Sequence, residues 1–142
     1  MWVSRTIRAI SVRRFASWYY TVDHEWLRYD EKKQTGVIGI TEHAQQKLGE
    51  VVHIELPKVG STCKQGEIIG DVDSTGVVDH FFTPISGTVL EVNQKLKTIP
   101  HLLNSSPLED GWVAKVQVSD PSEISNLMDE EGYRKMIEDD FV

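Results

Sequence analysis

Short apolar runs separated by turn-forming residues occupy most of this chain, a pattern typical of an all-β domain. Alternating or β-branched residues predict strands over 20–29, 37–40, 51–56, 67–73, 77–83, 87–93 and 112–118. Proline, glycine or polar clusters lie between these runs. Six or seven short strands separated by turn-forming residues predict a small sandwich or flattened barrel.

Helical patterns are confined to short segments. Residues 41–49 predict a two-turn helix with Thr41 as N-cap, Gly49 as its stop and a small apolar face of Ala44 and Leu48. A second short helix is expected over 95–104, interrupted at Pro100.

The C-terminal segment has the strongest helix signal. Asp120 as cap, Pro121 at the first position and Glu123 at the third predict a capping box. Ile124, Leu127 and Met128 then share one face. We expect a second helix from Asp129, with Tyr133, Met136 and Ile137 on its inner side.

Two expected strands, 67–73 and 77–83, meet at a tight turn over Ser74, Thr75 and Gly76. Pro84 fixes the backbone where the second strand must stop, and Gly87 tolerates the bend that starts the next one. The sequence therefore predicts a hairpin with an exposed tip.

Charge is divided unevenly along the chain. Residues 1–22 hold four arginines and no acid, so eleven basic residues remain to face all 22 acids, and the body has a net charge of about −11. An acid-free, arginine- and serine-bearing arm is typical of a mitochondrial presequence, and a disordered basic tail is the alternative. We therefore assign 1–19 as a presequence or basic arm and 20–142 as the folded domain, and expect a location on the matrix side of the mitochondrion. An arm that is retained would suit an anchored subunit.

The acidic body disfavours nucleic acid as a partner, because phosphate binding needs a basic surface. It suits protein partners with basic patches. No apolar run approaches the roughly 20 residues that cross a bilayer. The nucleophile-elbow, phosphate-loop and dinucleotide motifs are absent, so an independent enzyme is the least supported class.

Candidate chemistry is sparse. The five histidines show no helical metal-ligand spacing, so we expect no metal site. His80 is the most interesting of them because it lies beside the hairpin tip. Asp71, Asp73 and Asp79 are either an acid–base set or, in the favoured interpretation, a solvated rim. Cys63, the only cysteine, lies in a polar turn and is interpreted as an incidental surface thiol.

Several stretches resemble the glycine cleavage system H-protein family. The resemblance covers about residues 20–141 and rests on the hairpin, on Asp23-His24-Glu25-Trp26, on 41–49, on the Val51–Gly60 wording and on Ser119-Asp120-Pro121. Without the resemblance, residues 23–26 can be interpreted in two ways. They are the start of a strand with Trp26 in the core, or a carboxylate–histidine pair. The family implies an all-β lipoyl/biotinyl-carrier-like sandwich with short peripheral helices and a C-terminal helical segment.

In that family the hairpin tip carries a lipoyl group on a lysine. Asp73 and Ser74 match the family's Glu-Ser, Thr75 its valine, and Gly76, followed by Val77, stands at the lysine position. No lysine lies between Lys64 and Lys95. Because glycine replaces the attachment lysine, we expect this chain to have no lipoyl cofactor. We also expect no catalytic residue.

Two functions fit this departure. The first is a non-lipoylated accessory or structural subunit of a larger mitochondrial assembly, acting through its surfaces. The second is an H protein that takes part in glycine decarboxylation by docking to the glycine cleavage enzymes, or a working carrier whose lysine has been replaced.

Overall fold

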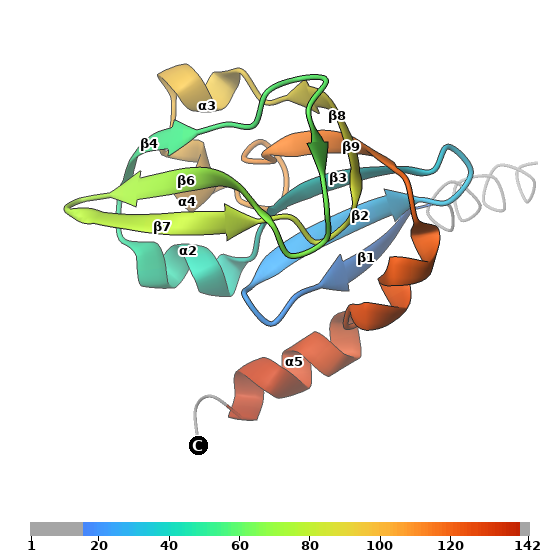
Figure 1. Cartoon of the computed structure of the whole chain (residues 1–142). Helices are drawn as coiled ribbons and strands as arrows, with labels where there is room; N and C mark the ends of the chain where they lie inside the picture. The colour runs from blue at the N-terminus through green and yellow to red at the C-terminus, as the bar shows by residue number, and fades with distance from the viewer. Residues whose placement is uncertain (1–15, 140–142) are drawn as a thin grey trace, which may run out of the picture.

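The computed structural model describes residues 16–139 and contains two antiparallel sheets (Figure 1). The six-stranded sheet has the order β1-β2-β3-β9-β8-β5 and the three-stranded sheet the order β4-β6-β7. The strands are β1 Ala16–Tyr20, β2 Glu25–Asp30, β3 Thr35–Ile40, β4 Val51–Glu55, β5 Thr62–Cys63, β6 Ile68–Ser74, β7 Val77–Phe82, β8 Gly87–Val92 and β9 Ala114–Val118. The expected all-β, flattened sandwich of the lipoyl-carrier type is confirmed.

Short helices cover the ends of the sheets. They are α2 Glu42–Leu48, α3 Lys95–Thr98, α4 Leu102–Ser105, the 3-10 helix η1 Pro121–Asn126, and α5 Glu130–Asp139. The predicted cap of α2 is present, since the Thr41 hydroxyl accepts the Ala44 N–H at 3.2 Å. The predicted break at Pro100 separates α3 from α4. In the described part of the chain, no helix combines the length and apolarity needed to cross a membrane.

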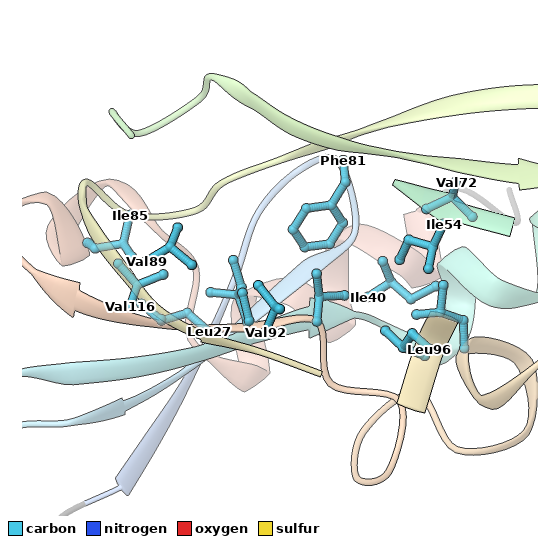
Figure 2. Close-up of a cluster of buried hydrophobic side chains, with 14 of the residues drawn as sticks. Leu27, Ile40, Ile54, Val72, Phe81, Ile85, Val89, Val92, Leu96 and Val116 are labelled. Atoms are coloured by element: carbon cyan, nitrogen blue, oxygen red, sulfur yellow. The ribbon is translucent and has the colours of Figure 1, made fainter. Parts of the chain in front are cut away.

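The core lies between the two sheets. Figure 2 shows Phe81 reaching from β7 into the middle of the cluster, with Ile54 and Val72 on one side and Ile85 and Val89 on the other. All five side chains are at most 4% exposed. Burying this much apolar surface is the main favourable term that holds the sheets together.

Trp26 is fully buried, as predicted for a core residue. It lies on the face of β2 opposite Leu27, however, where it is not covered by the second sheet. Its indole N–H donates to the carbonyl of Pro107 at 3.1 Å, so the loop after α4 covers it. This bond explains why a loop from 81 residues further along is fixed against β2.

The single strand expected over 20–29 is wrong. The chain forms β1, which ends at Tyr20, and β2, which begins at Glu25. The Thr21 hydroxyl accepts the backbone N–H groups of Asp23 (3.2 Å) and Glu25 (3.1 Å), and this turn reverses the chain. The expected domain boundary between residues 19 and 20 falls inside β1, while residues 1–15 of the basic arm lie outside the described residues.

The capping box predicted at Asp120 is also wrong. Asp120 does cap the segment, accepting the Ser122 N–H at 3.2 Å, but the segment is a 3-10 helix. The Glu123 carboxylate does not return to the cap; it accepts the N–H and the hydroxyl of Ser86 at 2.9 and 2.7 Å. The Glu123 side chain therefore binds Ser86, which is distant in sequence, instead of forming the local capping box. The second predicted helix is confirmed as α5, with Tyr133 buried.

Cys63 is buried rather than a surface thiol, so that interpretation is corrected. The side chain is 7% exposed, and its sulfur lies 3.5 Å from the Gly87 carbonyl and 3.7 Å from that of Ile85. Burial raises the pKa of the thiol, and the contacts to Thr83 and Gly87 partly oppose that rise. The polar sequence around Cys63 hid this, because β5 pairs with β8 and turns the sulfur inward.

Candidate functional site

The hairpin of β6 and β7 ends in a two-residue loop, Thr75-Gly76, closed by the pair Ser74 and Val77. Gly76 has φ +83°, a left-handed conformation that glycine adopts without steric cost. A Cβ at this position would meet no atom within 4 Å. Figure 1 shows the tip projecting at one end of the molecule. The Gly76 position is therefore accessible to a partner.

The β6 side of the hairpin tip is anchored to the body, although Gly76 itself is open. Ser74 is 3% exposed, and the Thr75 N–H donates to the Glu50 carbonyl at 3.3 Å. Val77 and Val78, directly after the loop, are 55% and 61% exposed. A fixed hairpin with two exposed valines at its end is a surface suited to contact another protein.

A cleft of about 430 Å³ lies beside this hairpin, between β7, α2 and the start of β2. Apolar side chains, among them Ile40, Leu48 and Phe81, share its lining with charged groups. The complete lining is Asp23, His24, Glu25, Ile40, Ala44, Lys47, Leu48, Val72, Val78, Asp79, His80, Phe81 and Phe82. The cleft can accept a group that combines apolar and polar parts.

Glu25 is the most perturbed charged group of the cleft. It is only 3% exposed, and its carboxylate accepts the Thr21 hydroxyl at 2.7 Å and the Phe82 N–H at 3.1 Å. Burial raises the pKa of Glu25 to about 7, although these two hydrogen bonds act in the opposite direction. Near neutral pH this side chain can therefore hold or release a proton inside the cleft.

The acidic cluster predicted from sequence does not converge. Asp71 and Asp73 alternate with Val72 along β6, while Asp79 pairs with Val72 and so shares its face of the sheet. Asp71 instead contacts His80, whose Nδ1 lies 2.7 Å from a carboxylate oxygen. The favoured interpretation, a solvated rim, fits this arrangement better than an acid–base set does.

Tertiary structure brings one further residue of α2 to the lining of the cleft and another against a lining residue. Lys47 of α2 lines the same cleft as β7. His43, also in α2, packs at a tilt against His24, a residue of the cleft lining, with ring centroids 4.5 Å apart. Within residues 16–139, no group of three or more histidine, cysteine or acidic side chains is placed to hold a metal ion. Only the helical spacing of 43 and 47 hinted at a shared face.

Comparison with known proteins identifies the architecture. The family model described as "Glycine cleavage H-protein" matches residues 18–140. The chain belongs to the glycine cleavage H-protein family. An H protein from Anaeromyxobacter sp. (strain K) is 46% identical over 120 residues, covering 84% of this chain and 92% of its own length. In keeping with that family of carriers, the chain is not an enzyme.

Other similar members of this family include a plant protein and a bacterial protein of known structure. The mitochondrial glycine cleavage system H protein of Oryza sativa subsp. indica is 44% identical, covering 96% of this chain and 85% of its own length. The crystal structure of an H protein from Mycobacterium marinum superimposes with a TM-score of 0.77 at 31% identity, covering 85% of this chain and 96% of that one. Both mitochondrial and bacterial H proteins are thus similar to this chain.

Proposed function

We propose that this protein takes part in glycine decarboxylation by docking to the enzymes of the glycine cleavage system, without carrying a lipoyl group of its own. The docking role rests on the exposed hairpin end, where Val77 and Val78 lie beside the cleft and the Thr75 N–H anchors the turn to the Glu50 carbonyl. Membership of the H-protein family along most of the chain supports the choice of partners.

The residue at the tip does not fit the family's cofactor. A lipoyl group is joined through an amide to a lysine side chain, and Gly76 offers no side-chain amine. The lysine that lines the cleft, Lys47, belongs to a helix rather than to the hairpin turn. We therefore assign no reaction step to a lipoyl arm in this chain. Its proposed contribution is to bind and orient partner surfaces.

A second candidate is an accessory subunit of a larger mitochondrial assembly. The absence of a side-chain amine at position 76 motivates this candidate, together with the intact turns and caps such as those at Thr41 and Gly49.

The four arginines of residues 1–22 and the mitochondrial plant relatives support a location in the mitochondrial matrix for either candidate. A third arrangement, a carrier whose natural lysine has been replaced, predicts a lipoyl adduct on native protein.

The intact mass of the native protein tests whether a lipoyl group is attached. We expect the mass of the polypeptide alone, with or without residues 1–19. A lipoyl or octanoyl adduct would contradict the proposal and favour a working carrier. The same measurement reports whether the basic arm is removed.

Binding measurements test docking directly. The full chain is titrated against the glycine decarboxylase, the aminomethyltransferase and the lipoamide dehydrogenase of the system. We expect Val78→Asp at the hairpin end to weaken binding at least about tenfold, which is about 1.4 kcal/mol. Val59→Asp is the matched control, because Val59 is 59% exposed and lies in the loop between β4 and β5. Failure to bind any of the three enzymes would favour the accessory-subunit role.

A further inference from the structure

A row of four paired residues crosses the six-stranded sheet on its outer face. Trp18 of β1 pairs with Arg28 of β2, Arg28 pairs with Val37 of β3, and Val37 pairs with Lys115 of β9. Directly paired residues project from the same face of a sheet. The chain neighbours of this row in β2, β3 and β9 are buried on the core side, at most 6% exposed where a value is given, so the row itself faces away from the core.

The turn between β2 and β3 adds two cations to this row. The Asp30 carboxylate accepts the backbone N–H groups of Lys32 and Lys33 at 3.1 and 3.2 Å, which closes the turn. A cleft of about 420 Å³ is lined by these residues together with Arg28 and Lys115. Asp30 is its only acidic lining residue. We call this surface the basic cleft.

The basic cleft contrasts with the rest of the molecule. Beyond residue 22 the chain has eleven basic residues against 22 acids, and four of the eleven line this one cleft. Within the part of the chain that the structure describes, Arg28, Lys33 and Lys115 form no salt bridge. The guanidinium of Arg28 instead lies 5.7 Å from the centre of the Trp18 ring, which holds the planar fork at the surface.

The spacing of the charges indicates the kind of ligand. Arg28 and Lys115 stand two strands apart, which is about 10 Å between backbones. The basic cleft therefore presents separated cations on a partly apolar floor rather than one pocket for a single anion. A long nucleic acid would also meet the acidic surroundings, whose net charge opposes it. A short peptide with several carboxylates and an apolar side chain matches both the charges and the floor.

We propose that the basic cleft is a docking site for an acidic segment of a partner protein. Arginine suits this role because its planar fork binds carboxylates with two parallel hydrogen bonds. The site lies on the six-stranded sheet, whereas the hairpin tip belongs to the three-stranded one. It is therefore independent of the proposed docking at the hairpin, and either can fail without the other.

The test uses the full chain labelled with ¹⁵N and two synthetic peptides. One peptide is acetyl-Glu-Asp-Leu-Glu-Asp-amide, and the other replaces its acids with Gln and Asn. We expect the acidic peptide to shift the amide signals of β2, β3 and β9 and the indole signal of Trp18. Because NMR reports each residue, binding to the arginines of residues 1–22 is separated from binding to the cleft.

A pair of double variants gives the matched comparison. Arg28→Gln with Lys115→Gln should weaken the acidic peptide at least about tenfold at the cleft signals. Lys95→Gln with Lys97→Gln makes the same change in net charge on α3 and should alter the affinity less than about twofold. Unchanged signals of β6, which lies in the other sheet and holds none of the substituted residues, verify without peptide that each variant is folded.

Four results would overturn the proposal. The neutral peptide shifts the same signals at the same concentration, or the α3 variant loses as much affinity as the cleft variant. The third is an oligothymidylate that shifts the cleft signals at lower concentration than the acidic peptide, which would make the cleft a nucleic-acid surface. Absence of any shift at the cleft signals with millimolar acidic peptide counts equally against it.

Discussion

The carboxylate of Glu25 accepts the backbone N–H of Phe82 at 3.1 Å, joining the start of β2 to the end of β7. The bond links the six-stranded sheet to the strand that forms half of the candidate hairpin. Phe82 is the last residue of β7, so the contact fixes where the hairpin leaves the body. A group with a pKa of about 7 therefore sits at the junction between scaffold and site.

Glu25 should make the protein less stable as pH rises from about 4.5 to 7. The folded-state pKa is raised above the unfolded value of 4.5, so the folded protein binds the proton more tightly in this window. The stabilisation is present below pH 4.5 and is lost as pH rises through 7, and it amounts to about 3 kcal/mol.

Glu25→Gln mimics the protonated side chain and isolates this effect. We expect the variant to match the original protein near pH 4.5 and to exceed its free energy of unfolding at pH 8, measured by urea titration at several pH values. The difference between the two proteins cancels the contributions of the histidines. A constant difference across the range would contradict the raised pKa of Glu25.

Gly76→Lys should restore weak lipoylation. Its side chain would enter open space, but the φ of +83° costs a residue other than glycine about 1 kcal/mol. Thr75 and Val77 also differ from the family's hairpin wording. We expect a small fraction of adduct by intact mass after incubation with a lipoate–protein ligase, lipoic acid and ATP. Complete refusal by a competent ligase would mean that the hairpin shape has changed too.

Gly60→Lys is the control for that experiment. Gly60 has φ +90° and open space around a built Cβ, but it lies in another turn. It should lose similar stability and accept no lipoyl group. Equal labelling of both variants would indicate a ligase that does not read the hairpin.

Tyr133→Phe should loosen α5 from the body. The Tyr133 hydroxyl lies 2.6 Å from the Thr41 hydroxyl and 2.9 Å from Nδ1 of His24, while its ring stacks on Tyr20. Phenylalanine keeps the stack and loses the hydrogen bonds, at a cost of about 1 to 2 kcal/mol. The readouts are urea unfolding and the rate of trypsin cleavage within α5, which should increase.

Tyr19→Phe controls for deletion of a hydroxyl as such. The Tyr19 hydroxyl forms no hydrogen bond with any residue in the described range 16–139, and its ring packs against the core. We expect a change below about 0.5 kcal/mol. If both variants lose the same stability, the network around Tyr133 contributes nothing specific.

The Cys63 thiol should react slowly in the folded protein. Its burial removes it from solvent and raises its pKa, so both access and thiolate fraction are reduced. We expect labelling by a chromogenic disulfide reagent to be at least about a hundredfold slower than in denaturing urea. Because the chain has one cysteine, the reading is unambiguous. Equal labelling rates in the folded and the denatured protein would contradict the burial of Cys63.

Local patterns explain which elements were predicted well. The cap at Thr41 and the stop at Gly49 are local hydrogen-bond and φ requirements, and the structure has both. The tight turn at Thr75 and Gly76 likewise follows from a glycine between two β-branched runs. Where a neighbour distant in sequence competed, prediction failed: Ser86 takes the Glu123 side chain away from the expected capping box.

The sequence by itself determined the all-β class, the hairpin and the glycine at its tip, because periodicity, turn residues and side-chain identity are local properties. Only the tertiary structure decided the surroundings of that tip. It placed α2 and β7 on two sides of one cleft, so that Lys47 lines that cleft, and it buried Glu25 and Cys63 inside polar stretches of sequence. Burial and charge proximity arise from strand pairing between distant segments, and no local spacing records them.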